Sequence, residues 1–87
     1  SNVSIDEIEQ SDLNIYPNPT NGFITLSSND SYLEEITLVN IQGQIVLSKD
    51  VSSKKIEIDV AEYPSGVYFM TAQLSNGQTT TKKLIKY

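Results

Sequence analysis

Apolar and polar residues alternate with a period of two along most of the chain from Leu13 onward. Successive side chains of a β-strand point to opposite faces, so this period predicts strands with one buried face. The alternation is most regular in residues 56–60, where three β-branched apolar residues bracket Glu57 and Asp59. Shorter runs of the same kind are found at Leu13 and Ile15, Ile24 and Leu26, Ile36 and Leu38, and Ile45 and Leu47. The pattern therefore favours strands and gives no support for a helical repeat.

Residues 67–70 depart from the alternation because all four are apolar. Such a run is expected where a strand is covered on both faces or lies near the centre of a sandwich. We therefore predict that Val67, Phe69 and Met70 belong to the core. Tyr68 is predicted to pack there as well, with its hydroxyl at the rim, as large aromatic side chains usually do.

Turn signals separate the apolar runs at regular intervals. Asn76-Gly77, between residues 70–74 and residues 79–85, predicts a hairpin of the type I′ kind. Gly43, between residues 37–41 and residues 44–47, predicts a second hairpin. Polar stretches at residues 27–31 and 50–53 are predicted to be further turns. Several short strands at this spacing predict a sandwich or a small barrel, and we estimate seven strands in two antiparallel sheets.

Two prolines and a glycine lie close together in Tyr16-Pro17-Asn18-Pro19-Thr20-Asn21-Gly22. Each proline fixes its own φ and restricts the preceding residue to extended geometry. Asn21-Gly22 can supply the positive φ that a tight turn needs. The segment is therefore predicted to be either a stiff bend at the start of the folded part or a recognised surface.

The 87 residues carry a net charge of −5 and no arginine, which argues against nucleic acid as a partner. The acidic, polar residues 1–12 are predicted to be a linker, with a short helix over residues 5–10 as the alternative, and residues 13–87 to form one domain. No apolar run reaches the roughly 18–20 residues of a membrane span. No signal peptide opens the chain. The start at Ser1-Asn2, without a methionine, indicates a piece of a longer protein.

Histidine and cysteine are both absent from the sequence. Their absence removes the usual general base near neutral pH, the imidazole and thiolate metal ligands, and the thiolate nucleophile. Glu34 and Glu35 are expected to point to opposite faces of a strand, and Glu57 and Asp59 to share a solvated outer face. We therefore expect no catalytic residue, no metal site and no cofactor, and we predict that the domain is not an enzyme.

Four segments of the chain, taken in order, resemble one protein family. They comprise Tyr16, Pro17, Asn18 and Pro19 followed by Gly22; the strand and hairpin that contain Asn40 and Gly43; Pro64, Ser65, Gly66, Val67 and Tyr68; and the lysine-rich end Lys82, Lys83, Leu84, Ile85, Lys86 and Tyr87. In this order and spacing, the chain from about Leu13 resembles the C-terminal sorting domain of type IX (Por) secretion, in its type A form. Gln44, Tyr63 and Asn40 depart from the basic residue, leucine and aspartate that are common at these positions.

The resemblance implies an all-β, immunoglobulin-like antiparallel β-sandwich that serves as an address. The cargo protein, covalently linked on the N-terminal side, would cross the periplasm of a Gram-negative bacterium. The domain would then direct it to shuttle and translocon components of the type IX system in the outer membrane. A sortase-like peptidase would remove the domain, and the cargo would be joined to lipopolysaccharide or released. The resemblance therefore implies a non-enzymatic domain on a cell-surface or extracellular protein.

The lysines of the last segment allow two interpretations. Lysine on an edge strand can block unwanted pairing. Alternatively, Lys82, Lys83 and Lys86 belong to a docking strand that meets an acidic receptor groove or adds to its sheet. Two other functions remain open for the whole domain. It could be a carbohydrate-binding or adhesive module with an aromatic platform, or a spacer in a multidomain surface protein. The platform would be built from phenylalanines and from Tyr16, Tyr32, Tyr63, Tyr68 and Tyr87, and loss of glycan binding on substitution of Tyr32 or Tyr63 would support it.

Overall fold

Seven β-strands form two antiparallel sheets in a computed structural model that describes residues 13–87. The predicted linker, and its alternative helix, lie outside the described residues. The strands are β1 (Leu13–Tyr16), β2 (Phe23–Ser28), β3 (Leu33–Asn40), β4 (Ile45–Ser53), β5 (Lys55–Asp59), β6 (Gly66–Leu74) and β7 (Thr79–Lys86). The described part of the chain holds no helix with the length and apolarity that a membrane span needs.

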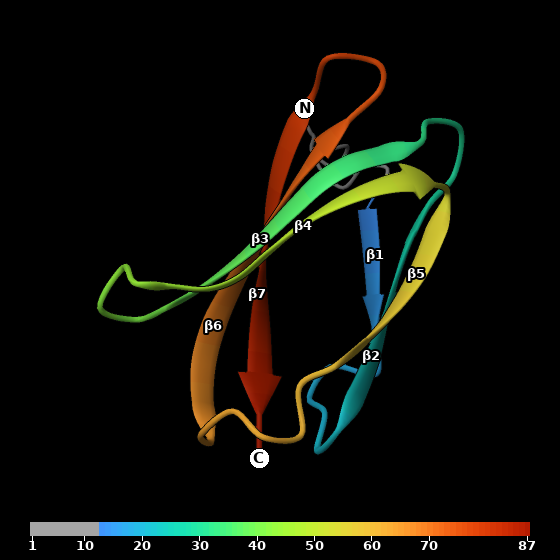
Figure 1. Ribbon diagram of the computed structural model, residues 1–87. Helices are drawn as coiled ribbons and strands as arrows, with labels where there is room; N and C mark the ends of the chain where they lie inside the picture. The colour runs from blue at the N-terminus through green and yellow to red at the C-terminus, as the bar shows by residue number, and fades with distance from the viewer. Residues whose placement is uncertain (1–12) are drawn as a thin grey trace, which may run out of the picture.

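The two sheets pack face to face as a sandwich (Figure 1). One has three strands in the order β1-β2-β5, and the other has four in the order β4-β3-β6-β7. On one side the chain passes from β4 directly into β5 through Lys54, whose carbonyl accepts a hydrogen bond from the Ser28 amide at 2.8 Å. On the other side β1 lies near β7. The prediction of seven strands in an antiparallel sandwich is therefore confirmed.

The core lies between the sheets and is almost entirely aliphatic. The apolar residues of the alternating runs supply it from both sides, and the largest fully buried side chains include Leu13, Ile24, Leu26, Leu33, Ile36, Leu38, Met70, Leu74 and Leu84. Ile58 and Val60 are buried while Glu57 and Asp59 are exposed, as the period of two predicts. Burying such side chains contributes about 1.5–3 kcal/mol each, which makes this layer the main source of stability.

The apolar run in β6 is not buried on both faces. Tyr68 and Met70 face the core with 5% and 0% exposure, whereas Val67 and Phe69 are half-buried on the outer face of the four-stranded sheet. The prediction that Val67 and Phe69 belong to the core is therefore wrong. The side chains of β6 alternate between the two faces, as in any strand. No further layer of residues 13–87 packs over the outer face, so the outward side chains stay partly exposed.

Both predicted hairpins form, but with three-residue loops. The Gly77 amide donates to the Leu74 carbonyl at 3.0 Å, and the Leu74 amide donates to the Gln78 carbonyl at 2.9 Å. The same pattern joins Asn40 to Gly43 and Gln44. Gly43 and Gly77 have φ of 84° and 91°. This is a turn followed by one left-handed residue, so the predicted type I′ hairpin at Asn76-Gly77 is wrong.

Two local irregularities change the predicted strand limits and faces. Residues 50–53, predicted to be a turn, belong to the nine-residue strand β4, and only Lys54 separates β4 from β5. A register shift between Leu33 and Glu35 interrupts the alternation in β3. Leu33 and Ile36 are both buried, and Glu34 and Glu35 between them are both exposed. The prediction that the two carboxylates alternate between the faces of a regular strand therefore fails at this irregularity.

Candidate functional site

The Tyr16-Pro17-Asn18-Pro19 segment lies along the outer edge of β7. The Asn18 side-chain amide donates from Nδ2 to the Lys83 carbonyl at 2.8 Å, and its Oδ1 accepts from the Ile85 amide at 3.1 Å. One side-chain amide thereby makes the pair of hydrogen bonds that a residue of a neighbouring strand would make. The Tyr16-Pro17 and Asn18-Pro19 peptide bonds are both cis. Asn18 thus takes the place of a strand residue beside β7.

Thr20 continues this pairing with its backbone. Its amide donates to the Ile85 carbonyl, and its carbonyl accepts from the Tyr87 amide, both at 2.9 Å, in a parallel bridge opposite Lys86. The Thr20 side chain is 2% exposed, and its hydroxyl donates to the Phe23 carbonyl at 2.9 Å while accepting from the Gly22 amide at 3.1 Å. Gly22 is not among the glycines with positive φ. The Thr20 hydroxyl therefore organises the turn into β2, and Gly22 does not supply the positive φ predicted for Asn21-Gly22.

We call these contacts of Asn18 and Thr20 with β7 the β7 clip. It pairs the outer edge of the strand from the Lys83 carbonyl to the Tyr87 amide. The preceding part of this edge, next to Thr79 and Thr81, has no backbone partner within residues 13–87. Both segments of the clip belong to the family-like motifs of the sequence, but about sixty-five residues separate them, so their contact is visible only in the folded domain.

The six residues proposed for docking do not form one surface. Leu84 is fully buried and Lys86 is 8% exposed, with its Nζ donating to the Tyr87 carbonyl at 2.9 Å. Lys82, half-buried, lies on the same inward-facing side of β7. Lys83, Ile85 and Tyr87 project from the other side, and Ile85 and Tyr87 are 37% and 67% exposed. Only these three present side chains on the outer face of the sheet.

The hairpin between β3 and β4 is shaped by the side chain of Asn40. Its Oδ1 accepts from the amides of Gln42 and Gln44 at 2.9 and 3.0 Å, and its Nδ2 donates to the Gln44 Oε1 at 2.9 Å. Gly43 adopts a positive φ at the last loop position, which a side chain would strain. Both Asn40 and Gly43 therefore have a conformational role in this hairpin.

The Pro64-Ser65-Gly66-Val67-Tyr68 segment is tied back by its own tyrosine. The Tyr68 hydroxyl donates to the Pro64 carbonyl at 2.5 Å, and the ring is buried, as predicted. The Tyr63 ring lies 6.3 Å from that of Tyr68, and its hydroxyl contacts the Val46 carbonyl on β4 at 3.4 Å. These contacts bring the segment next to the hairpin between β3 and β4.

A pocket of about 360 Å³ lies where the hairpin meets this segment. Its lining is Asn40, Ile41, Gln42, Val46, Pro64, Ser65, Gly66, Val67 and Tyr68. None of these residues carries a carboxylate, an amine or a thiol, so the pocket offers apolar contact together with neutral amide and hydroxyl groups. The second and third of the four segments thus meet at this pocket, as the first and fourth meet at the β7 clip. Ile41 and Val46 were not singled out from the sequence, because their position becomes relevant only once the hairpin is folded.

The tyrosines considered for a glycan platform are dispersed. Tyr16 projects from β1 and Tyr32 lies before β3, with exposures of 45% and 53%. Lys54 Nζ lies 5.8 Å from the Tyr32 ring centroid. Tyr63 is half-buried against Tyr68. Within residues 13–87 no group of three or more metal-ligating side chains comes together.

Comparison with known proteins places these features in a family. Residues 14–87 match the family described as the secretion system C-terminal sorting domain, known as the Por secretion tail. The chain belongs to this family. The resemblance drawn from the four segments is therefore confirmed over nearly the whole chain, and this sorting domain is the one that carries the clip and the pocket described above.

Two curated relatives carry a similar segment. The ulvan lyase NLR42 of Nonlabens ulvanivorans is 26% identical over 84 residues, which are 95% of this chain and 16% of that protein. Beta-agarase D of Zobellia galactanivorans is 32% identical over 73 residues, which are 84% of this chain and 14% of that protein. The sorting domain therefore spans about a sixth or less of the length of either relative.

Solved structures support the fold of the sorting domain. A DUF3244 family protein from Bacteroides vulgatus, with an immunoglobulin-like β-sandwich, superposes with a TM-score of 0.75 at 17% identity, covering 91% of this chain and 88% of that one. CopC from Methylosinus trichosporium OB3b gives a TM-score of 0.54 at 17% identity, covering 87% and 90%. The immunoglobulin-like fold expected from the sequence is confirmed.

Proposed function

We propose that this domain is a non-enzymatic address that directs a covalently attached cargo protein through the type IX outer-membrane translocon. The match to the sorting-domain family over residues 14–87 is the observation that carries this proposal. The two curated relatives, a lyase and an agarase, carry the matched segment as a small part of much longer chains. A secreted enzyme of this kind is the parent protein that best suits the domain.

The proposed sorting function implies a sequence of export steps. The cargo passes through the periplasm, and the folded domain meets shuttle and translocon components of the type IX system. A sortase-like peptidase then cuts on the N-terminal side of the domain, and the cargo is joined to lipopolysaccharide or released at the cell surface. The compact sandwich supports this order of events, because a protease needs an extended, accessible chain and residues 13–87 are folded into strands and short turns.

The outward side chains of β7 are the part of the lysine-rich segment that suits docking. Lys83, Ile85 and Tyr87 are exposed, whereas Leu84 and Lys86 are buried. The β7 clip occupies the strand edge beside them, so recognition through side chains is favoured over addition of a strand at this point. Deleting residues 82–87 is therefore a poor test of docking, since it also removes a core strand.

The test is a fusion of the whole chain to the C-terminus of a periplasmic fluorescent reporter. The fusion is expressed in a type IX-competent strain and in a translocon-null mutant, and both are fractionated for reporter location and size. We expect the reporter at the surface or in the medium only in the competent strain, with loss of the mass of the domain. A reporter carrying the immunoglobulin-like neighbour from Bacteroides vulgatus, which shares the fold at 17% identity, is the control for a folded tail. Reporter retained in the periplasm of both strains would contradict the proposal and direct attention to glycan binding.

A further inference from the structure

The outer face of the four-stranded sheet is divided into rows that run across the strands. The register aligns Ile45, Val39, Phe69 and Lys83 in one row, and Val67 with Ile85 in the row beside it. The next row on the other side consists of hydroxyl residues: Ser48, Thr37, Thr71 and Thr81. Beyond it lie Asp50, Glu35, Gln73 and Thr79. Apolar side chains are therefore gathered at the end of this face next to the hairpin between β3 and β4.

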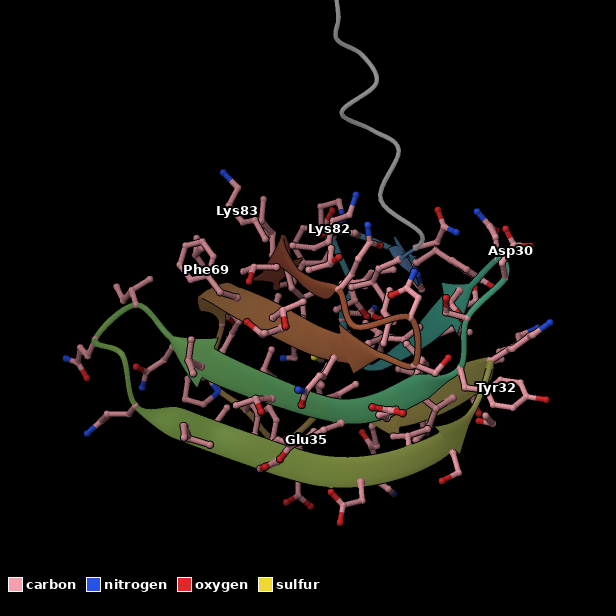
Figure 2. All side chains as sticks on the ribbon, turned by 90° about the horizontal axis from the view of Figure 1, so that it is seen from above. Asp30, Tyr32, Glu35, Phe69, Lys82 and Lys83 are labelled. Atoms are coloured by element: carbon pink, nitrogen blue, oxygen red, sulfur yellow. The ribbon has the colours of Figure 1, made fainter. Side chains whose placement is uncertain are left out.

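We call Val39, Ile45, Val67, Phe69 and Ile85 the outer stripe. Ile45 and Ile85 are 65% and 37% exposed, and the other three are half-buried, on a face that no described element covers. Figure 2 shows Phe69 beside Lys83 at one end of the sheet, with Glu35 well apart from them. Contiguous exposed apolar patches on a protein surface are typical of interaction sites.

The outer stripe joins the pocket and the docking strand into one surface. Val67 belongs to the stripe and also lines the pocket. Ile85 belongs to the stripe and to the exposed side of β7. Three of the four segments that carry the family resemblance therefore contribute to a single continuous face: the hairpin between β3 and β4, the Pro64–Tyr68 segment and the lysine-rich strand.

The charges on this face select the chemistry of its partner. Lys83 is the one charged residue in the two apolar rows, and the carboxylates of Glu35 and Asp50 lie two rows away from it. A partner that covers the stripe must therefore be apolar at its centre, with an acidic group facing Lys83 and none facing the carboxylate row. A second copy fits less well, because the carboxylates it could offer to Lys83, those of Glu35 and Asp50, lie two rows away from its own stripe.

We propose that the outer stripe is the docking surface for a component of the type IX translocon that presents an apolar surface flanked by carboxylates. This inference rests on the proposed function and gives it a location. The partner covers Val39 and Phe69, its acidic group pairs with Lys83, and an apolar side chain of the partner enters the adjoining pocket. The β7 clip lies at the edge of the sheet and stays closed in this arrangement.

The experiment uses the reporter fusion with the full chain in the type IX-competent strain. The test variant is Val39→Thr with Phe69→Thr, which keeps β-favourable side chains and copies the neighbouring threonine row. The matched control is Thr37→Ser with Thr71→Ser, on the same strands and face. A second pair compares Lys83→Glu with Lys55→Glu, which changes the charge of an exposed lysine on β5 of the other sheet. Each purified domain is also checked by thermal unfolding, so that only folded variants are compared.

We expect the Val39/Phe69 variant and Lys83→Glu to lower surface or extracellular reporter by about tenfold or more, the size of effect expected at the centre of an interface. Both control variants should match the unmodified domain. If the unmodified domain is exported and the folded test variants are exported equally well, the docking surface is wrong and the proposed function stays intact. If the unmodified domain is not exported, the proposed function itself fails. A domain that forms a dimer in solution, broken by the Val39/Phe69 substitutions alone, would assign the stripe to a second copy instead.

Discussion

Removing the Asn18 side chain tests whether the β7 clip holds the sandwich together. Asn18→Ala deletes the hydrogen bonds to the Lys83 carbonyl and from the Ile85 amide, at 2.8 and 3.1 Å. Each such bond contributes about 0.5–1.5 kcal/mol net of water. Because the Asn18 side chain is exposed, water can hydrogen-bond to the two backbone groups in the variant and recover part of this free energy. We expect a loss of about 1–2 kcal/mol in the free energy of unfolding, a substantial part of the roughly 5–10 kcal/mol typical of a small domain.

The assay is urea unfolding of the purified domain, followed by far-UV circular dichroism or tyrosine fluorescence, since the chain has five tyrosines and no tryptophan. With an m-value of about 1 kcal/mol/M, the midpoint should fall by about 1–2 M. Amide hydrogen exchange supplies a local readout, because Ile85 loses its acceptor and should exchange faster. Asn18→Asp should cost at least as much, because it turns a carboxylate oxygen toward the Lys83 carbonyl in place of a donor.

Asn21→Ala is the matched control, since Asn21 is exposed in the same loop and its side chain makes no hydrogen bond within residues 13–87. It should leave the midpoint unchanged within about 0.5 kcal/mol. Equal midpoints for the Asn18 and Asn21 variants, or an Ile85 amide that stays protected in Asn18→Ala, would refute the reasoning that this side chain pairs the strand edge.

Two further pairs of substitutions test the turns. Thr20→Val keeps the shape of the buried side chain but leaves the Phe23 carbonyl and the Gly22 amide without their partner. We therefore expect the free energy of unfolding, measured with a chemical denaturant, to fall by about 1–3 kcal/mol, with Thr20→Ser close to the parent. Equal stability of the valine variant and the parent would contradict this role of the hydroxyl. Gly43→Ala should cost about 1–2 kcal/mol because φ is positive, and Gly22→Ala should be nearly neutral because φ is not positive and no atom lies within 4 Å of the added carbon. Calorimetric melting of both alanine variants checks this pair, and similar melting temperatures would count against it.

The strand pattern could be predicted because it depends on local alternation. Ile56, Ile58 and Val60 face the core as their period requires, and the glycines at residues 43 and 77 mark real hairpins. The type of hairpin was missed, because the Asn-Gly pair suits two kinds of loop and the hydrogen-bond pattern decides between them.

Features that depend on contacts between distant residues could not be predicted. Val67 and Phe69 resemble core residues in sequence, yet the sandwich has two layers and leaves them on the outer face. Similarly, nothing local to Asn18 indicates that its side chain pairs with β7. The four family segments were correctly singled out, whereas the outer stripe required the register of β3, β4, β6 and β7.

The β7 clip makes the integrity of the domain depend on residues near both of its ends. The parallel bridge between Thr20 and Lys86 closes a loop of more than sixty residues, so forming it carries the entropic cost of bringing two distant parts of the chain together. The exposed side of β7 is consequently held in position only in the finished sandwich. A chain that has not completed its fold, or has lost its last strand, lacks the arrangement of side chains that we propose the translocon reads. If the translocon reads this face as we propose, export would be restricted to cargo whose sorting domain has completed its fold.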